Sequence, residues 1–408
     1  MRVLLAHNFY GSCGPSGENV AYCAERDLLR RMGLKVSEYV RTSDGLRRGG
    51  WLGAVRGGLS TPWNPFAAGS VRRLLRQERP DILHVHNCFP LLSPAVFHAA
   101  RGLKTATVLT LHNYRLFCAA GIPLRGNAPC TACLEKRSTL DALKYGCYRK
   151  SRLATVPLAA MIGLHRRIGT WEHHVDAFIA LTEFQRELMI RAGLPGERVF
   201  VKPHFYADAP DPVRWQDREL KAVFIGRVAG EKGVSLLVEA WREWGGSAPK
   251  LEIIGDGPDR GKLENSVAGT ALAARISFAG QLPFDETQRR LGGARLLVVP
   301  SVWFEGFPMV IREAFALGVP VAGSRLGSIV CVIRDGSDGV LFAAGDAGAL
   351  GTAVRSVWDE PGRLEGMARA ARKSFEQRYT PEINGDQLAA IYRAAIARRR
   401  SVTVSSRL

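Results

Sequence analysis

The chain has 408 residues, of which 46% are hydrophobic and 23% are charged, so its composition is that of a soluble globular protein with room for two domains. No apolar stretch is as long as a membrane span, and the first residues hold only a four-residue apolar run. The sequence therefore excludes a membrane-spanning protein and predicts a strand, not a signal peptide, at the N-terminus. The expected location is the cytoplasm.

The net charge of +18 is unevenly distributed. Residues 1–205 hold 29 Lys and Arg against 14 Asp and Glu, a net +15, whereas residues 206–408 hold 27 against 24, a net +3. A basic half attracts anionic partners such as a lipid surface, a lipid-diphosphate substrate or nucleic acid. No nucleic-acid-binding motif accompanies the charge, so we expect no nucleic-acid partner. A peripheral position at the inner membrane face stays open.

The N-terminal segment predicts a strand at 3–6, a glycine-rich loop at 11–19 and a helix at 20–32. This order is typical of a nucleotide-binding α/β domain. The glycines fall at 11, 14 and 17, which is not the dinucleotide fingerprint, so a plain turn and a phosphate cradle are both open. Residues 45–70 are rich in Gly, Arg and Trp, and their weak periodicity predicts a mobile loop with a short helix.

Two further strands are predicted at 81–86 and 107–111, and the second delivers His112 and Asn113 at its carboxyl end. In open α/β sheets ligands bind at that end of the strands. His112 is therefore a candidate catalytic residue, with a structural histidine as the alternative.

Four cysteines follow at Cys118, Cys130, Cys133 and Cys147, in the pattern C-x11-C-x2-C-x13-C. A close pair in a turn is typical of a zinc knuckle, and four thiolates would make a structural zinc site with no position for water. The alternative is that these residues are small apolar side chains without a metal.

Residues 151–168 predict either a buried helix with a polar end, which we favour, or an amphipathic helix that meets a membrane. Residues 206–218 are acidic, contain proline and lack periodicity, which indicates a linker. We therefore expect a first Rossmann-like domain at 1–205, the linker, a second domain at 219–380, and a final helix at 381–408 that packs back on the first domain.

The second domain begins with a strand at 222–225, followed by Gly226-Arg227 and Lys232-Gly233 at a helix start. Two cations beside free N–H groups can neutralise a diphosphate without a metal, and a structural salt bridge is the alternative. A later strand at 296–299 runs into a loop and a helix that starts near Pro308. Glu305 in that loop and Glu313 in the helix suit sugar or ribose hydroxyls.

The segment from Glu305 to Glu313 resembles the Glu-x7-Glu signature of retaining glycosyltransferases of family 4, and the resemblance extends over almost the whole chain. It implies the GT-B fold, in which two Rossmann-like domains face each other across a cleft, and transfer from a nucleotide-diphosphate sugar with retained configuration and no catalytic metal. His112, Asn113 and Tyr114 resemble a family motif, and the cysteines resemble an insert found after it in a subset of the family.

The resemblance also implies residue roles. Arg227 and Lys232 would bind the donor diphosphate, Glu313 the ribose hydroxyls and Glu305 the sugar hydroxyls, while His112 would lie beside the anomeric centre and Gly17 in the interdomain cleft. The backbone that would contact sugar and phosphate comprises Gly306, Phe307, Pro308, Met309 and Val310. Many relatives carry a Glu shortly after the glycine at 327, where this chain has Ile329, Val330 and Cys331, which leaves the donor preference open.

The expected function is retaining transfer of a sugar from a nucleotide-diphosphate donor to a saccharide acceptor, lipid-linked, in bacterial cell-envelope or exopolysaccharide biosynthesis. The alternatives are a natural-product glycosyltransferase, another GT-B enzyme such as a nucleotide-sugar epimerase, and a non-catalytic GT-B scaffold. Intact Arg227, Lys232, Glu305 and Glu313 argue against the scaffold.

Overall fold

A computed structural model describes residues 1–11, 16–126 and 128–405. The chain forms two compact units. The first unit comprises Met1–Pro123, Thr131–His204 and Pro381–Leu408, and the second comprises Leu124–Cys130 and Phe205–Thr380. Residues 12–15 of the expected glycine loop lie outside the described residues.

The first unit is built on a six-stranded parallel sheet in the order β2-β1-β3-β4-β7-β8. The central strands are short apolar runs buried on both faces, as parallel sheets covered by helices require. The strands are β1 (Arg2–Phe9), β2 (Lys35–Thr42), β3 (Ile82–Asn87), β4 (Ala106–Thr110), β7 (Ala177–Ala180) and β8 (Val199–Val201).

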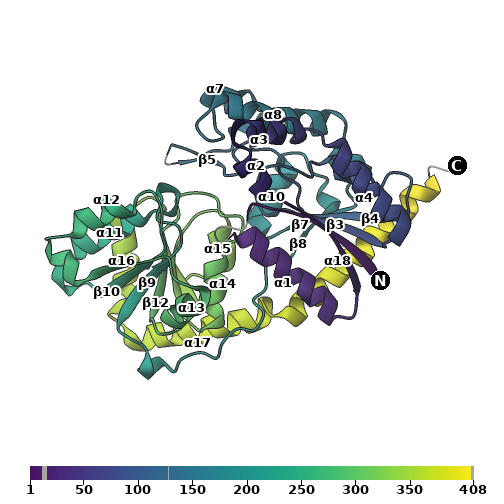
Figure 1. Ribbon diagram of the computed structural model, residues 1–408. Helices are drawn as coiled ribbons and strands as arrows, with labels where there is room; N and C mark the ends of the chain where they lie inside the picture. The colour runs from purple at the N-terminus through teal and green to yellow at the C-terminus, as the bar shows by residue number, and fades with distance from the viewer. Residues whose placement is uncertain (12–15, 127, 406–408) are drawn as a thin grey trace. The chain divides into compact units, whose positions relative to one another are not determined.

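Helices connect these strands and cover the sheet (Figure 1). They are α1 (Gly17–Arg31), α2 (Asp44–Arg48), α3 (Gly50–Ser60), α4 (Pro65–Glu78), α5 (Ala95–His98), α6 (Ala132–Glu135), α7 (Leu140–Tyr145), α8 (Arg152–Arg167), α9 (Thr170–His173), α10 (Glu183–Arg191) and α18 (Pro381–Ser405).

The prediction of a mobile loop at 45–70 was wrong, because α2, α3 and the start of α4 occupy it. The usual helical pattern is reversed in α3: its glycines face inward and its large side chains face solvent. A Cβ on Gly53 would lie 2.0 Å from the carbonyl oxygen of Leu46, so α2 and α3 pack at backbone contact distance. A search for a buried apolar stripe could not find such a helix.

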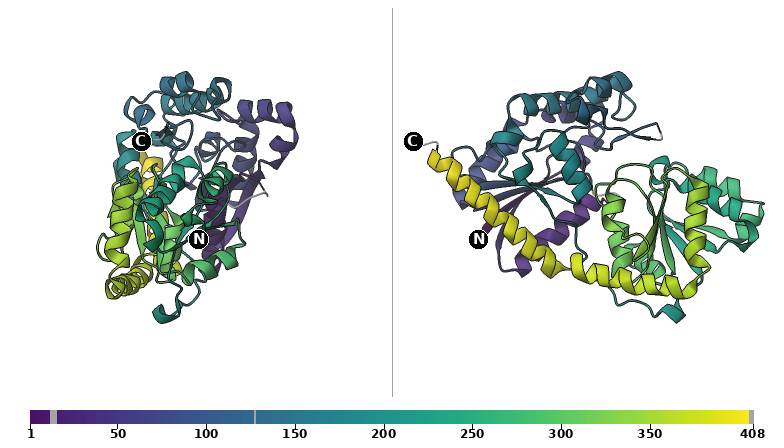
Figure 2. Two further views of the ribbon diagram at one scale, coloured as in Figure 1. Left: turned by 90° about the vertical axis from the view of Figure 1, so that its left-hand side faces the viewer. Right: turned by 180° about the vertical axis from the view of Figure 1, so that it is seen from behind.

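The long helix α18 lies along the first unit, where it packs against β4 and β7 (Figure 2). Leu388, Ile391 and Tyr392 are buried in one core with Val108 and Ala177 of these strands. The C-terminal helix therefore completes the core of a unit that begins at the N-terminus.

The second unit is a six-stranded parallel sheet in the order β11-β10-β9-β12-β13-β14. Its strands are β9 (Lys221–Ile225), β10 (Lys250–Ile254), β11 (Ile276–Gly280), β12 (Leu296–Val299), β13 (Val321–Ser324) and β14 (Gly339–Phe342). Its helices are α11 (Val234–Trp244), α12 (Arg260–Val267), α13 (Phe284–Gly292), α14 (Met309–Ala316), α15 (Ser328–Val332), α16 (Ala347–Trp358) and α17 (Pro361–Arg378). A short antiparallel hairpin, β5 (Leu124–Arg125) with β6 (Ala128–Pro129), groups with this unit.

Both units are Rossmann-like α/β folds, which confirms the predicted fold class. In the second unit the strand order reverses between β9 and β12, the position where open α/β sheets bind ligands beyond the carboxyl ends of the strands. Within the described residues, no helix combines the length and the apolar character needed to cross a bilayer.

Candidate active site

The strand-order reversal of the second unit carries a lysine–glutamate pair. Lys232 follows β9 and Glu305 follows β12, and Lys232 Nζ donates to Glu305 Oε1 at 2.6 Å. Ser301 Oγ donates to the same oxygen at 2.8 Å, so the carboxylate is held from two sides. Lys232 Nζ also lies 5.4 Å from the centre of the Trp303 ring, a cation–π distance. The Lys232 side chain as a whole is 27% exposed, so it is only partly covered by this contact.

Close backbone packing fixes the two loops that carry this pair. Val302 N donates to the carbonyl of Glu231 at 3.0 Å, which joins the loop after β12 to the loop after β9. Gly233 has φ +68°, and a Cβ there would lie 2.0 Å from the carbonyl oxygen of Pro300. Only glycine meets both conditions without displacing the neighbouring loop.

The helix α14 begins directly after Glu305. Pro308 is its N-cap, and Met309 and Val310 form its first turn, whose backbone N–H groups have no partner within the helix. The ring of Phe307 is buried and lies 5.9 Å from that of Tyr379. The backbone from Gly306 to Val310 is thus a helix start at the carboxyl end of β12, and such a start favours anions through its N–H groups and dipole.

Glu313 lies one turn into α14 and is nearly buried. Arg312 Nη2 donates to its Oε1 at 3.0 Å, and Gln288 Nε2 donates to its Oε2 at 3.3 Å. Burial raises the pKa of Glu313, and Arg312 opposes that rise. Burial and the charge of Glu313 also raise the pKa of Tyr206 to about 12, and the Tyr206 hydroxyl donates to Gln288 Oε1 at 3.2 Å.

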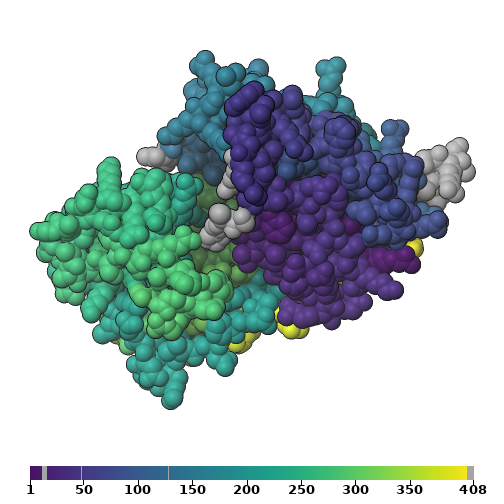
Figure 3. All heavy atoms as spheres, in the orientation of Figure 1, coloured from purple at the N-terminus to yellow at the C-terminus, as the bar shows by residue number. Residues whose placement is uncertain are grey.

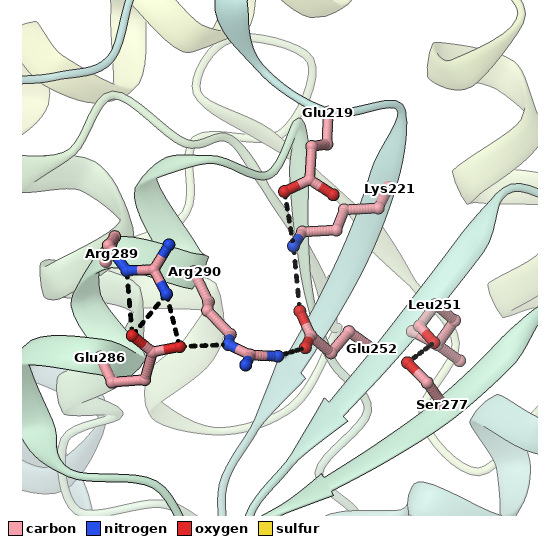
Figure 4. Close-up of polar contacts among 8 residues, drawn as sticks. All are labelled: Glu219, Lys221, Leu251, Glu252, Ser277, Glu286, Arg289 and Arg290. Carbon is pink, nitrogen blue, oxygen red and sulfur yellow. Dashed lines mark hydrogen bonds and ion pairs between the residues drawn. The ribbon is translucent and has the colours of Figure 1, made fainter.

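Gln288 is carried by α13, which an ion network ties to the sheet (Figure 4). Arg290 bonds Glu252 of β10 and, at 2.6 Å, Glu286 of its own helix. Lys221 of β9 lies 3.0 Å from the same Glu252. The network fixes α13 against β9 and β10 and thereby positions Gln288 beside Glu313.

Arg227 behaves differently from Lys232. Its side chain is 64% exposed, and its guanidinium lies 3.8 Å from the carboxylate of Glu231. An exposed pair at this distance contributes little stability. The structure therefore brings Lys232 and Glu305 into contact and leaves Arg227 available to an anion at the rim of the same loop.

His112 follows β4 of the first unit and lines an open pocket. The enclosed part of this pocket is small, about 40 Å³, and the pocket opens to solvent. Burial, and then the neighbouring imidazoles of His204 and His86, lower the pKa of His112 well below its usual value, which keeps the ring neutral. Its Nδ1 is buried and has no hydrogen-bond partner among the described residues.

A buried polar network lies behind His112. His86 Nδ1 is 3.1 Å from His112 Nε2, and His86 Nε2 is 3.2 Å from Glu25 Oε1. Glu25 also receives a hydrogen bond from Lys202 Nζ at 2.7 Å, and Lys202 is 1% exposed. Although burial raises the pKa of Glu25, the charges of Lys202 and His86 lower it further, to well below its usual value.

Among the described residues, Glu25, His84 and His86 are the only three metal-ligand side chains whose ligand atoms lie within 4.8 Å of one another. The ammonium of Lys202 contacts this carboxylate, so a cation would meet a positive charge there. The group therefore fits an internal ion pair better than a metal.

The expected zinc cysteines do not form such a group. Cys133 is buried with Phe89 and Leu158, and Cys147 packs against the same cluster. Among the described residues, no three of these four sulfur atoms lie within 4.8 Å of one another. Cys130 falls in the segment that groups with the second unit. The four cysteines as arranged do not fit a four-thiolate site. Cys133 instead acts as a small apolar side chain in the core, which was the alternative.

Gly17 is the first residue of α1, and the residues after it attach that helix start to the sheet. Asn19 Oδ1 lies 3.0 Å from His7 Nε2, and Asn113 Nδ2 donates to Glu18 Oε1 at 2.6 Å. Burial raises the pKa of Glu18. These contacts bring Gly17 into the same region of the first unit as Asn113, the neighbour of His112.

Sequence reasoning missed His86, Glu25, Gln288 and Arg312. One signal was present: His84 and His86 alternate in β3 and so share one face of the strand, with Ile82. No comparable signal marks Gln288 or Arg312, because their roles depend on how α13 packs against α14.

Comparisons with known proteins agree with this geometry. Residues 207–374 match the family "Glycosyl transferases group 1", and residues 20–204 match the family "Glycosyl transferase 4-like domain". The chain is a GT-B glycosyltransferase.

Relatives and a solved structure support this assignment. A 2-deoxystreptamine glucosyltransferase of Streptomyces kanamyceticus is 29% identical over 78% of each chain. The amylovoran biosynthesis glycosyltransferase AmsK of Erwinia amylovora is 25% identical over 53% of this chain and 56% of its own. The fold matches that of Anabaena HepE in complex with UDP, with a TM-score of 0.65, 16% identity and coverage of 96% of this chain and 99% of that chain.

Proposed function

We propose that this glycosyltransferase transfers a sugar from a nucleoside-diphosphate donor to a saccharide acceptor, with retention of configuration and without a catalytic metal. The observation that carries the proposal is the contact between Lys232 and Glu305 at the strand-order reversal of the second unit, directly before the start of α14. The cation and the helix start suit a diphosphate, and the carboxylate suits the hydroxyl groups of the attached sugar.

Lys232 and Glu305 bind different parts of the donor: Lys232 the diphosphate and Glu305 the sugar. The departing diphosphate gains negative charge as the bond from the anomeric carbon to its oxygen breaks, and a preorganised cation stabilises that charge. Lys232 can turn from Glu305 to the diphosphate, because its side chain is partly exposed. Glu305 then accepts hydrogen bonds from sugar hydroxyls while Ser301 keeps it oriented.

Glu313 serves as the ribose ligand in this proposal. It is held by Arg312 and Gln288 inside the unit, so it offers hydroxyl groups a fixed acceptor. The backbone of Gly306 to Val310 binds sugar and phosphate, and Arg227 adds a second cation at the rim. The family resemblance supports these roles and retention of configuration.

His112 acts in the first unit as a neutral hydrogen-bonding residue that orients a sugar hydroxyl near the anomeric centre. The low pKa of its ring and its unpartnered Nδ1 support this role. Gly17 contributes backbone at a helix start in the same unit.

The acceptor that we favour is a lipid-linked saccharide of bacterial cell-envelope or exopolysaccharide biosynthesis, reached by a peripheral protein at the inner membrane face. The net +15 of residues 1–205 and the relative named for amylovoran biosynthesis support it. A second candidate is a small natural-product acceptor, which the relative named as a 2-deoxystreptamine glucosyltransferase favours.

The test is donor binding by thermal shift with UDP, GDP, ADP and dTDP sugars, for the wild type and for Lys232→Ala and Glu313→Ala. A shift of several degrees for one nucleotide, lost in both variants, would identify the donor. Lys262→Ala is the matched control, since Lys262 is an exposed lysine on α12 of the same unit. No shift with any nucleotide would overturn the proposal.

A further inference from the structure

Two segments of the first unit contain many basic residues and no acidic ones. Residues 45–77 hold six Arg, residues 142–171 hold six Lys or Arg, and neither segment contains Asp or Glu. These segments hold 63 of the 408 residues, yet they hold ten of the twenty exposed large hydrophobic residues that the structure describes. Charge and exposed apolar surface therefore gather in the same part of the chain.

The helix α3 shows how this surface arises. Trp51, Leu52, Val55 and Leu59 follow one stripe of the helix, and Trp51 and Leu59 are 74% and 75% exposed. The opposite side carries Gly53 and Gly57, which pack against Leu46. The large apolar side chains of α3 are thus its outward face, and its small residues are its packing face.

The helix α8 lies beside α3 and extends this surface. A Cβ on Gly58 of α3 would lie 3.4 Å from Pro157 of α8, so the two helices touch. Leu153, which is 85% exposed, and Val156 lie on the outward side of α8. Its inward side buries Leu158 and Ile162, as the predicted buried helix requires.

Figure 3 shows residues 45–60 and the neighbouring part of 140–165 side by side on the surface of the first unit, and Figure 1 places α7 at the same end. Phe66, which is 86% exposed, follows α3 at the first turn of α4. Among the described residues, no carboxylate pairs with the exposed bases of these segments, which include Arg48, Arg56, Lys144 and Arg152.

We infer that α3 and α8, with the adjoining turns of α4 and α7, form a docking face for an anionic lipid bilayer. A large exposed apolar patch marks an interaction surface. Tryptophan, leucine and phenylalanine beside Arg and Lys are typical of helices that lie in a membrane interface, where apolar groups enter the acyl boundary and cations meet lipid headgroups. The two segments contain no acidic residue, and Asp141 of α7 pairs with Lys136, so the face favours a negatively charged bilayer over a mixed-charge protein surface.

The inference deepens the proposed function, because it assigns the peripheral membrane position to named helices, and it does not depend on donor chemistry. Docking can be measured on the full chain without nucleotide, and donor binding can be measured without lipid. Failure of one therefore leaves the other intact.

The experiment is co-sedimentation of the full chain with phosphatidylcholine vesicles and with vesicles of about one-third phosphatidylglycerol. We expect binding to the anionic vesicles only, weakened by salt. Leu59→Ser/Leu153→Ser should lower the partition coefficient about tenfold. Leu220→Ser/Val330→Ser, which changes two exposed apolar residues of the second unit, should leave it unchanged.

A contact measurement complements the variants. Brominated lipids should quench the wild-type tryptophan fluorescence, and Trp51→Phe should remove most of that quenching while the chain still binds. Absence of binding to anionic vesicles would overturn the inference. An equal loss of binding in the control pair, or a lipid-free dimer that Leu59→Ser/Leu153→Ser dissociates, would also overturn it, the latter by showing that the face meets protein.

Discussion

Nδ1 of His86 lies 3.1 Å from Nε2 of His112. Glu25 Oε1 lies 3.2 Å from His86 Nε2, which places a carboxylate behind the two rings, although neither of these two atoms makes a hydrogen bond among the described residues. His112 Nδ1 is likewise buried and without a hydrogen-bond partner among the described residues, so the 3.1 Å contact with His86 is what orients the His112 ring.

The first prediction concerns this chain of residues. His112→Ala should lower the rate of sugar transfer by about 100-fold, because an oriented polar group near the reacting centre is lost. His86→Leu should lower it by a smaller factor, since it removes the contact with His112 Nε2 but keeps the His112 ring. Initial rates at saturating donor test both changes. His173→Asn, which alters an exposed histidine of the same unit, is the control, and equal rates in all four proteins would contradict the role of His112.

The second prediction separates the members of the lysine–glutamate pair. Lys232→Met should weaken binding of the nucleoside diphosphate by about 100-fold, because it removes a charge-assisted contact. Glu305→Gln should not weaken that binding, since the carboxylate competes with the diphosphate for Lys232, but it should lower turnover. Calorimetric titration with the diphosphate and a transfer assay measure the two effects. A similar loss of diphosphate affinity in Glu305→Gln would show that Glu305 does not compete.

The third prediction tests the close approach of the two loops. Gly233→Ala should weaken donor binding and lower the melting temperature, because its Cβ would overlap the carbonyl oxygen of Pro300. Gly245→Ala is the matched control, since Gly245 has φ +77° and open space around its Cβ position. Thermal unfolding and donor titration compare them. If both variants lose the same donor affinity and the same melting temperature, backbone strain and not loop contact explains the effect.

The fourth prediction concerns the buried ion pair of Glu25 and Lys202. Glu25→Gln leaves a buried ammonium without its counter-charge and should lower the free energy of unfolding by about 3 kcal/mol. Adding Lys202→Met should recover part of this loss, because the unpaired charge is then removed. Denaturant unfolding of the single and double variants measures these changes in the free energy of unfolding. Additive losses would mean that the two side chains do not interact.

The fifth prediction is a loss of stability in mild acid. Burial lowers the pKa of His7 to about 3 and those of His98, His165 and His174 to about 4. The unfolded chain protonates these rings near pH 6.5 and the folded chain does not, so the stability they contribute is full above pH 6.5 and is lost as the pH falls towards 4. Glu313 acts with the opposite sign from about pH 4.5 upwards, since its folded pKa is raised above that value.

Melting temperatures measured at intervals from pH 7.5 to 4.5, values chosen to bracket the usual His pKa of about 6.5, test this prediction. We expect the melting temperature to fall by several degrees once the pH passes below that value. A constant melting temperature over this window would show that the histidines protonate in the folded chain.

The sequence predicted the parallel α/β units because their strands are short apolar runs separated by helices with inward apolar stripes. It also predicted that Lys232 and Glu305 belong to one site, since each follows a strand at a glycine-rich or proline-bounded loop. It could not predict that Glu313 is paired with Arg312 and Gln288, because those contacts depend on the packing of α13 against α14. The prediction for residues 45–70 was wrong for another reason: α3 packs through its glycines, so its apolar residues point outward.

The path of the chain has a consequence for how the protein is made. Residues 205–380 of the second unit leave the ribosome before α18, which supplies Leu388, Ile391 and Tyr392 to the core of the first unit. The second unit can therefore fold during synthesis, while the N-terminal sheet waits with one face uncovered. The emergence of α18 covers that face. Translation that stops near residue 380 would therefore yield a folded second unit joined to an aggregation-prone first unit.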